Sequence, residues 1–464
     1  MTGKETTKFR LRPNASNGLW LCTLIPLSYM ANTWKHKSYV QFQGKVSTIV
    51  AFGLFLQTLV VLSQLRTNKP IGSSRKLLSS LPAAFTSFLI WICLNQAAVF
   101  SIVCGTSALL LYGSLYVHML KVLPQSFTFG EASVVGQGFV LFLLNVGLRL
   151  SGHSTYSAKH DIDDVTLILQ IGLVGVTFIV AATHFINIFR KDLWFYVLVA
   201  IVSLTVSVFP IKGYPAVVVL FSFLFADSQR IITLCAALVL LVITVITVIW
   251  FLITKRQSNT RTRKLFHILI VATFLPGIIY QCQLLFMTTA VMLALFVVLE
   301  TARIINLKFV GDALNESVAL FVDEKDAGLV ALTPIYLLVG CSLPLWLHPC
   351  PWCPIRPGAI DVLPLLSGVL SVGVGDTVAS VVGSKYGRHW WLNGDKSIEG
   401  TVASILAQGL VLIGLVYLQF LHVTTFQISV SAAAVIVNSL VEAHTNQVDN
   451  LVLPLVTFIG LSLS

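Results

Sequence analysis

Residues 77–120 read LLSSLPAAFTSFLIWICLNQAAVFSIVCGTSALLLYGSLYVHML, and no charged residue interrupts these 44 positions. An α-helix needs about 20 predominantly apolar residues to cross the hydrocarbon of a bilayer. The stretch is therefore long enough for two membrane-spanning helices, and the break between them is expected near the polar pair Asn95 and Gln96. Lipid, rather than water, is the expected solvent around this part of the chain.

Apolar runs of this kind recur along the whole sequence. The clearest are 46–65, 165–186, 231–253, 284–299 and 401–421, and weaker ones are 132–148, 193–211, 328–347, 362–382, 426–440 and 451–463. Because every backbone polar group must be paired inside lipid, runs this long are expected to be helices rather than barrel strands. The sequence predicts an all-α, polytopic integral membrane protein with about 13–15 transmembrane helices.

The overall composition agrees with a membrane protein and excludes an ordinary soluble domain. Of the 464 residues, 56% are apolar and 11% are charged, whereas a soluble domain carries about 25% charged residues. The net charge of +11 would indicate nucleic acid in a soluble protein. Here we attribute it to the retention of Lys and Arg in cytosolic loops, and we expect no nucleic-acid partner.

The membrane topology follows from the segment 255–264, which carries five basic residues and no acid. The positive-inside rule places such a segment in the cytosol. Counting spans onward from it puts 303–326, 383–400 and 441–450 on the same side, and these three segments hold most charges of the C-terminal half. A transporter would instead place its polar groups near the bilayer midplane. We therefore expect a site at the cytosolic interface, where a lipid headgroup and a soluble cosubstrate meet.

The two halves of the chain are expected to have different roles. Residues 1–250 have few internal charges and are predicted to form an N-terminal transmembrane bundle that acts as a scaffold or faces lipid. Residues 251–464 are predicted to form a C-terminal transmembrane catalytic domain with cytosolic loops. The acids Asp161, Asp163 and Asp164 are interpreted as a solvated helix start, where acids suit the helix dipole.

The segment richest in chemistry is 373–388, GVGDTVASVVGSKYGR, which is followed by KSIEGT at 396–401. If 376–387 is helical, Asp376, Ser380, Gly383 and Gly387 share one face. Small residues let a phosphate chain approach backbone amides, and basic side chains neutralise its charge. Lys385, Arg388 and Lys396 are the basic residues of this segment.

The same stripe of small residues has a plain structural interpretation, because such stripes are usually packing faces between membrane helices. An acid at the membrane edge weakens that interpretation, since acids within membranes are costly and tend to be functional. Asp376 is suited either to hold a divalent ion or to take the proton from an attacking hydroxyl. Residue types alone leave open whether the stripe is a packing face or a functional site. They also leave open whether Asp376 binds an ion or acts as a base.

These residues resemble the nucleotide-binding segment of the CTP-dependent polyprenol kinases. In addition, 263–267 (RKLFH) resembles the family's Arg-Lys-x-x-His segment, and 300–303 (ETAR) its Glu-x-x-Arg segment. The stretches 323–328 (DEKDAG), 332–336 (LTPIY) and 442–450 (EAHTNQVDN) are similar to those of dolichol kinases. The resemblance covers about residues 260–455, in the family's order.

The resemblance implies that CTP donates its terminal phosphate to the hydroxyl of dolichol, giving dolichyl phosphate for N-glycosylation and related mannosyl transfer. It also implies a divalent cation, with Mg²⁺ expected, and a location in the endoplasmic reticulum membrane with the site facing the cytosol. The sequence contains no Walker-type phosphate loop and no protein-kinase motif set. The phosphates must therefore be held in another way.

The resemblance and the residue chemistry together give a set of candidate site residues. The expected catalytic residues are Asp376 (also the candidate metal ligand), Lys396 and Glu399. The expected nucleotide-binding residues are Gly373, Gly375, Asp376, Ser380, Gly383, Ser384, Lys385, Gly387, Lys396, Ser397, Gly400 and Thr401. The expected substrate-binding or supporting residues are Arg263, Lys264, His267, Glu300, Arg303, Asp323, Asp326, Glu442 and Asp449. Glu300 and Arg303 are three apart on a helix and are expected to pair with each other.

Three alternatives to a dolichol kinase stay open. The first is a kinase for another lipid alcohol, such as phytol or diacylglycerol. The second is a lipid cytidylyltransferase, which would use CTP but release pyrophosphate. The third is a transporter or flippase, which predicts charged residues at mid-span and an internal repeat. The sequence leaves the oligomeric state and the isoprenoid length open.

Overall fold

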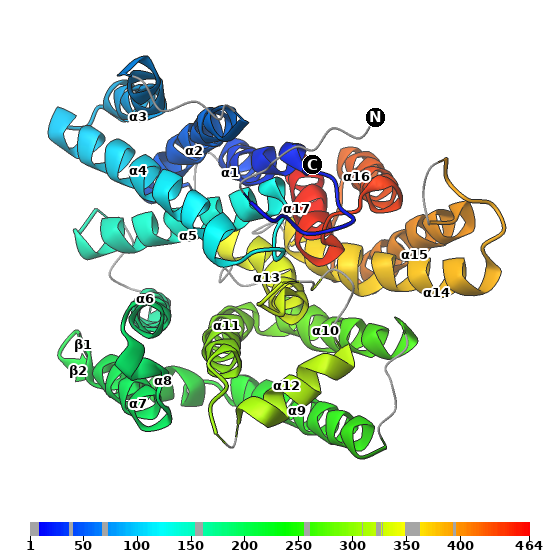
Figure 1. Cartoon of the computed structure of the whole chain (residues 1–464). Coiled ribbons are helices and arrows are strands. Elements are labelled where there is room, and N and C mark those ends of the chain that lie inside the picture. Colours follow the sequence, from blue (N-terminus) through cyan, green and yellow to red (C-terminus); the bar gives the residue numbers. More distant parts are fainter. Residues whose placement is uncertain are drawn as a thin grey trace, which may run out of the picture. The chain divides into compact units, whose positions relative to one another are not determined.

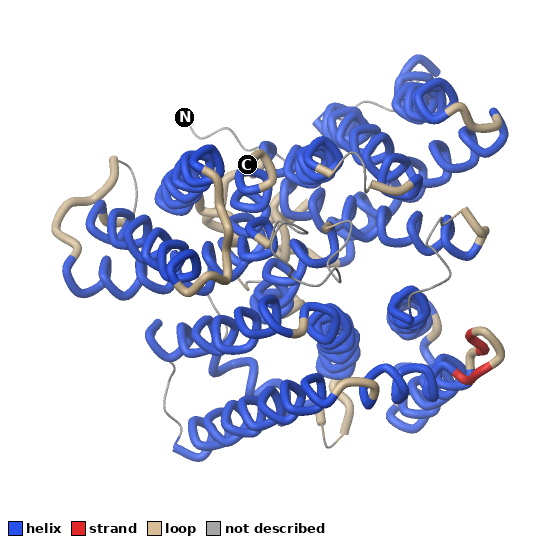
Figure 2. Tube along the Cα trace, turned by 180° about the vertical axis from the view of Figure 1, so that it is seen from behind, coloured by secondary structure: helices blue, strands red, loops and turns tan. Residues whose placement is uncertain are grey.

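The computed structural model describes residues 9–36, 40–66, 73–153, 161–254, 260–308, 310–321, 326, 328–348, 362–392 and 396–464. Helices make up nearly all regular structure in these residues (Figures 1 and 2). Among them, nine helices are long and apolar enough to cross a membrane, and six more apolar helices are shorter. The prediction of an all-α polytopic membrane protein is confirmed.

The chain divides into two compact units, and the division does not fall near residue 250. The first unit contains Met1–Thr155, Lys325–Val330 and Asn446–Val448, and the second contains the remaining residues. The functional division into residues 1–250 and 251–464 stays a prediction, because a division by contacts says nothing of where catalysis occurs.

The first unit is a helical bundle in which the long uncharged stretch forms two helices. The expected break is confirmed, since the chain leaves the helix at Asn95, whose φ of 50° is left-handed, a conformation that Asn tolerates better than most residues. The helices of this unit are η1 (Leu19–Thr23), α1 (Leu24–Lys35), α2 (Phe42–Arg66), α3 (Ser73–Leu94), α4 (Ala98–Val122) and α5 (Phe129–Leu150).

The second unit begins with a group of helices and one small hairpin. The helix α6 starts at Asp161, as expected for the acidic cluster, and Asp164 pairs with Lys212. Lys212 and Gly213 both have positive φ, which suits the two-residue turn between β1 and β2. The elements are α6 (Asp161–Phe185), η2 (Asn187–Arg190), α7 (Asp192–Val208), β1 (Pro210–Ile211), β2 (Tyr214–Pro215), α8 (Ala216–Phe225) and α9 (Ser228–Thr254).

The rest of the second unit carries most of the candidate site residues. Its elements are α10 (Thr260–Tyr280), α11 (Cys282–Ile304), α12 (Gly311–Phe321), α13 (Leu332–Leu347), η3 (Leu363–Leu366), η4 (Val369–Asp376), α14 (Thr377–Tyr386), α15 (Ile398–Tyr417), α16 (Thr425–His444) and α17 (Asp449–Leu461). The helix expected over 376–387 is present as α14, and η4 before it is a π-helix. π-Helical turns are rare and occur frequently at functional sites.

The segment 303–326, expected to be a loop, contains the helix α12 instead. Leu314 of α12 packs against an apolar cluster that includes Ile179 and Phe195, so the helix is held by contacts with residues far away in the sequence. The helix α8 was also absent from the predicted spans, because its ten residues are too few to cross a bilayer. Tertiary packing decides α12, whereas α8 is an apolar helix that only its shortness kept out of the predicted spans.

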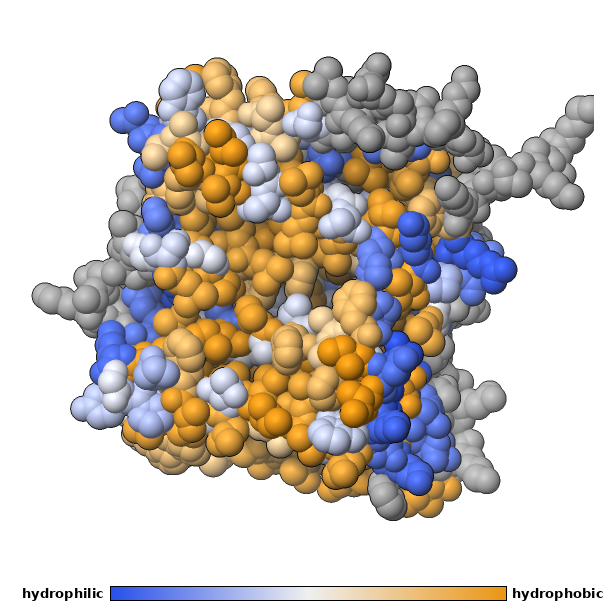
Figure 3. All heavy atoms as spheres, turned by 60° about the vertical axis from the view of Figure 1, so that its left-hand side comes forward, coloured by the Kyte–Doolittle hydropathy of each residue, from blue (hydrophilic) through white to orange (hydrophobic). Residues whose placement is uncertain are grey.

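The core of the second unit surrounds η3 and η4. Leu363, Leu366 and Leu370 are almost fully buried among apolar residues of α10, α13, α16 and α17. In the span Leu363–Tyr386, 72% of the most apolar window is buried, against 0% in Ser228–Trp250. The first is therefore a core helix and the second faces lipid. Figure 3 shows that apolar side chains cover most of the described surface on the face in view.

Candidate active site

Asp376 is held in a buried ion pair by the first turns of α10. It ends η4 and is 6% exposed. The Lys264 Nζ lies 2.5 Å from its Oδ2, and the His267 Nε2 lies 3.3 Å from the same oxygen. Lys264 and His267 are three residues apart, so one helix face presents both side chains. A buried carboxylate needs such partners, because an unpaired charge in an apolar interior is very costly.

A second ion-pair group surrounds Lys396, which directly precedes the N-cap of α15. Lys396 pairs with Glu442 near the end of α16, and its Nζ lies 3.9 Å from the Oδ2 of Asp449 at the start of α17. Burial acts to lower the pKa of Lys396, but the charges of Asp449 and Glu442 outweigh it and leave the pKa above its ordinary value. The ammonium is therefore charged at neutral pH.

The two ion-pair groups form one charged cluster. The charges of Asp376 and Lys396 interact with each other, and the His267 Nε2 lies 3.3 Å from the Oδ1 of Asn450 on α17. The resulting buried acid–lysine cluster consists of Lys264, His267, Asp376, Lys396, Glu442, Asp449 and Asn450. Sequence reasoning missed Asn450 as a site residue, although it ends the stretch 442–450; its position directly after Asp449 is the signal that could have found it.

The N-terminus of α15 places the positive end of a helix dipole beside Lys396. Ser397 is the N-cap, and its Oγ accepts a hydrogen bond of 3.2 Å from the backbone N–H of Gly400. The N–H groups of Ile398 and Thr401 donate to the carbonyls of His389 and Ser397, so the helix dipole is what favours an anion at this helix start. The sequence KSIEGT thus combines a charged lysine with a capped helix start, which suits phosphate.

The predicted glycines lie in close helix contacts. A Cβ on Gly383 would lie 2.8 Å from the Ser397 Oγ, and one on Gly400 would lie 2.8 Å from the Ala379 carbonyl oxygen. A Cβ on Gly387 would lie 2.8 Å from the Ser397 Cβ. These glycines let α14 pack tightly on α15, so packing is a sufficient reason for their size. Their role in nucleotide binding stays a prediction.

Gly375 gives a testable case of this close packing. A Cβ there would lie 2.6 Å from the Nε2 of Gln408, which is fully buried and donates to Ser404 and Ser439. The Gly375→Ala protein should lose about 1–3 kcal/mol of stability, because the amide cannot move without losing these bonds. A lower midpoint of thermal unfolding in detergent would show it.

Gly409→Ala is the matched control, because nothing lies within 4 Å of a Cβ at Gly409, which follows Gln408 in α15. This variant should unfold at the wild-type temperature or slightly above, since alanine is the better helix former. Equal midpoints for the two alanine variants would contradict the close contact at Gly375.

Several predicted residues have other partners than the buried acid–lysine cluster. Glu399 accepts hydrogen bonds from the backbone N–H of His389 at 3.1 Å and pairs with its Nδ1 at 2.7 Å. Lys385 is exposed, with its Nζ 5.1 Å from the centre of the Tyr386 ring. The catalytic role of Glu399 and the phosphate contact of Lys385 stay predictions.

The remaining nucleotide-binding candidates lie on α14 and α15 and at their facing ends. Thr401 accepts a hydrogen bond of 3.0 Å from the indole of Trp391. Ser384 donates to the carbonyl of Val381, and Ser380 is half-buried in the same helix. Gly373 lies against α10, where a Cβ on this glycine would lie 2.6 Å from the Cγ2 of Val271.

The expected ion pair between Glu300 and Arg303 is confirmed. Arg303 binds Glu300 through two bonds of 2.7 and 2.8 Å and also donates to the Oδ1 of Asn315. Glu300 accepts a hydrogen bond of 2.7 Å from the backbone of Ala331, the N-cap residue of α13. The pair therefore fixes the start of α13.

Three further supporting candidates do not belong to the buried acid–lysine cluster as the structure describes it. Arg263 lies in α10, but its side chain is not among those described. Asp326 lies in a half-buried coil position of the first unit. Asp323 lies outside the described residues.

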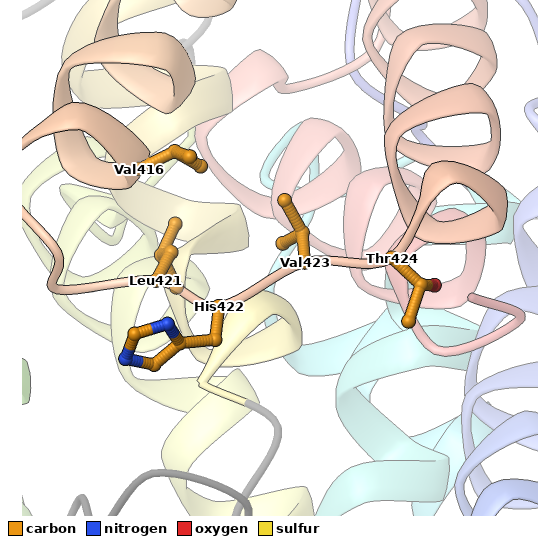
Figure 4. Close-up of a pocket in the computed structure, with 5 residues that line it drawn as sticks. All are labelled: Val416, Leu421, His422, Val423 and Thr424. Atoms are coloured by element: carbon orange, nitrogen blue, oxygen red, sulfur yellow. The ribbon is translucent and has the colours of Figure 1, made fainter.

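A pocket is lined by Val416, Leu421, His422, Val423 and Thr424, at the connection from α15 to α16 (Figure 4). This connection is at the opposite end of both helices from Lys396 and Glu442. A helix of 20 residues is about 30 Å long. The pocket is therefore far from the buried acid–lysine cluster.

The cluster offers oxygen ligands for a divalent cation only in part. Among the described residues, no three His, Cys, Asp or Glu side chains form a group that could hold a metal ion. Mg²⁺ commonly binds through one or two carboxylates together with substrate phosphates. Asp376, Glu442 and Asp449 fit that limited role, whereas a cage made of protein ligands alone does not form in the described part of the chain.

Comparisons with known proteins connect this geometry to a family. A family model described as dolichol kinase matches residues 8–342. A dolichol kinase of Bos taurus is 32% identical over 471 residues, covering 96% of this chain and 86% of the relative. A dolichol kinase of Homo sapiens is 34% identical over 388 residues (79% and 71%), and one of Arabidopsis thaliana is 26% identical over 473 residues (91% and 81%). No solved structure matches the chain.

Proposed function

This chain belongs to the dolichol kinase family, and from that membership we propose that it transfers the terminal phosphate of CTP to the hydroxyl of dolichol. The products are dolichyl phosphate and CDP. The observation that carries the proposal is the buried acid–lysine cluster beside the N-terminus of α15. It combines a carboxylate, two ammonium groups and the positive end of a helix dipole, which suit the charge neutralisation that phosphoryl transfer requires.

In this proposal Lys396 and the N-terminus of α15 hold the phosphates. Phosphoryl transfer requires little covalent chemistry from the protein, so positioning and charge neutralisation supply most of the catalysis. Lys396 is charged and 35% exposed at its side chain, so it remains accessible to a ligand. Glu442 and Asp449 hold its ammonium at the start of α15.

Asp376 accepts the proton of the dolichol hydroxyl. The hydroxyl oxygen forms the new bond to the terminal phosphorus, the bond from that phosphorus to the bridging oxygen breaks, and CDP leaves with the electron pair. Lys264 keeps Asp376 ionised, and His267, which also contacts Asn450, fixes the orientation of the carboxylate. These contacts hold the carboxylate in position for the attacking hydroxyl before the substrates bind.

The divalent cation and the cellular location complete the proposal. Mg²⁺ would neutralise phosphate charge, with one or both of Glu442 and Asp449 as its protein ligands. Lys264 is the last residue of the basic segment 255–264, and this supports a site facing the cytosol. The endoplasmic reticulum is the proposed membrane, because the product serves protein glycosylation there.

The test is phosphoryl transfer by the purified protein in detergent. CTP and, in parallel, ATP carry a labelled terminal phosphate, and dolichol, phytol and diacylglycerol are the acceptors. Label in dolichol from CTP, lost in Asp376→Ala, is the expected result. Label from ATP alone would reject CTP as donor, and label in another alcohol would reject dolichol.

Two further outcomes would reject the proposed reaction. Release of pyrophosphate with a cytidylyl group on the lipid would identify a cytidylyltransferase. No labelled lipid from either nucleotide, with folded protein, would exclude a kinase for these alcohols.

A further inference from the structure

The short segment Asn446–Val448 connects two helices of the second unit but belongs by its contacts to the first unit. It lies between the end of α16, which carries Glu442, and the start of α17, which carries Asp449. Both acids hold Lys396 in the buried acid–lysine cluster. A contact that fixes this segment therefore also limits the movement of Glu442 and Asp449, because the backbone connects them to it.

A buried ion pair of the first unit binds the backbone of this segment. Arg12 and Glu131 are 5% and 0% exposed, and the Arg12 Nη2 lies 2.7 Å from the Glu131 Oε1. The same Nη2 donates to the carbonyl of Asn446 at 3.1 Å. The backbone N–H of Val448 donates to the Glu131 Oε1 at 3.0 Å. The pair thus holds the segment at both ends.

The side chains of the segment are bound as well. Gln447 is fully buried, and its Nε2 donates to the carbonyl and the hydroxyl of Ser16 at 2.9 and 3.0 Å. Its Oε1 accepts from the Thr128 hydroxyl at 2.7 Å. The Asn446 Oδ1 accepts from the backbone and hydroxyl of Ser16 at 3.2 and 2.9 Å.

Simple packing of a connection does not account for this arrangement. Connections usually lie in solvent, and a buried ion pair adds little stability compared with apolar residues of similar size. Glu131 also caps α5, because its Oε2 accepts from the backbone of Thr128 at 2.9 Å. One carboxylate therefore joins a rigid helix start to the N–H of the residue that precedes Asp449.

We propose that Arg12 and Glu131 are positioning residues for the phosphoryl-transfer site, acting through Asn446–Val448 on Glu442 and Asp449. The expected effect on the KM for CTP rests on the proposed function, whereas the effect on the segment itself does not. When the segment is loosened, the two acids no longer hold Lys396 at the start of α15. The nucleotide is then bound and aligned less well.

The experiment compares Glu131→Gln with Asp164→Asn, in full-length protein in detergent. Both variants replace a paired carboxylate by its amide, but Asp164 pairs with the exposed Lys212 away from the cluster. In Glu131→Gln, backbone amides of 445–452 should exchange with deuterium faster than in wild type. The KM for CTP should rise about ten- to hundredfold, while the KM for dolichol stays unchanged. Asp164→Asn should match wild type in both measurements.

Each other outcome overturns a stated part of the inference. Unchanged exchange at 445–452 in folded Glu131→Gln would show that the ion pair does not hold the segment. Faster exchange with an unchanged KM for CTP would show that the segment does not position the site. A wild-type protein without kinase activity would reject the proposed function, while the exchange result would still decide whether the ion pair holds the segment.

Ser16→Ala serves if Glu131→Gln does not fold. It removes the hydroxyl that binds Asn446 and Gln447 but leaves the buried charges paired. Exchange at 445–452 and the KM for CTP should change in the same direction and by less. Wild-type values for both would overturn the proposal.

Discussion

The Asp376→Asn protein is expected to lose kcat by about a hundred- to ten-thousandfold, the range that a general base contributes. The amide has nearly the same size as the carboxylate, but it cannot accept the proton of the attacking hydroxyl. The KM for CTP should change little, because Lys396 and the N-terminus of α15 remain in place. Transfer of labelled phosphate to dolichol at saturating substrates measures the loss.

The control for this prediction must separate catalysis from folding. Asparagine at 376 leaves the ammonium of Lys264 buried beside a neutral group. Breaking a buried ion pair in this way costs about 3–5 kcal/mol of stability. The double variant Lys264→Met with Asp376→Asn removes both charges and should recover the unfolding temperature without recovering activity. Activity above about a tenth of wild type in Asp376→Asn would remove this residue from the mechanism.

The Lys396→Met protein is expected to lose about a hundred- to a thousandfold in kcat, as when one stabilising donor is removed from a transition state. The KM for CTP should also rise, since Lys396 is the charged group beside the capped start of α15. The KM for dolichol should not change. Steady-state kinetics with each substrate varied in turn would measure the three constants.

Lys212→Met is the matched control for the loss of a lysine. Lys212 pairs with Asp164 at an exposed position, so its loss should leave all three constants at wild-type values. A Lys396→Met protein with only a raised KM for dolichol would contradict the assignment. In that case the cluster would bind the lipid headgroup rather than the nucleotide.

Much of the fold could be predicted from hydropathy alone, because lipid imposes a simple rule on long apolar runs. The break at Asn95 shows how far this rule extends, since a single polar pair marks the end of α3. The helices α8 and α12 could not be predicted in this way, because they are short and are held by packing. The assignment of Asn446–Val448 to the first unit could not be predicted either, because such contacts leave no periodic pattern in the sequence.

The candidate site was predictable in its charged residues but not in their pairing. Asp376, Lys396 and Glu442 come from separate segments of the sequence, and the structure brings all three into one cluster. Spacing along the chain could not show that Glu399 turns to His389 instead. The pair of Arg12 and Glu131 joins residues 119 positions apart, and the capping box that contains Glu131 does not indicate Arg12 as its partner.

The contrast between the core span and the lipid-facing span bears on how amino-acid variants in this chain should be judged. Both Leu363–Tyr386 and Ser228–Trp250 are apolar, but only the first has most of its apolar window buried inside protein. In a packed span the shape of each side chain matters, so exchanging one apolar residue for another is damaging. In a span surrounded by lipid only polarity matters, because fluid chains adapt to any apolar shape. A change from leucine to phenylalanine is therefore harmful in one helix and silent in the other.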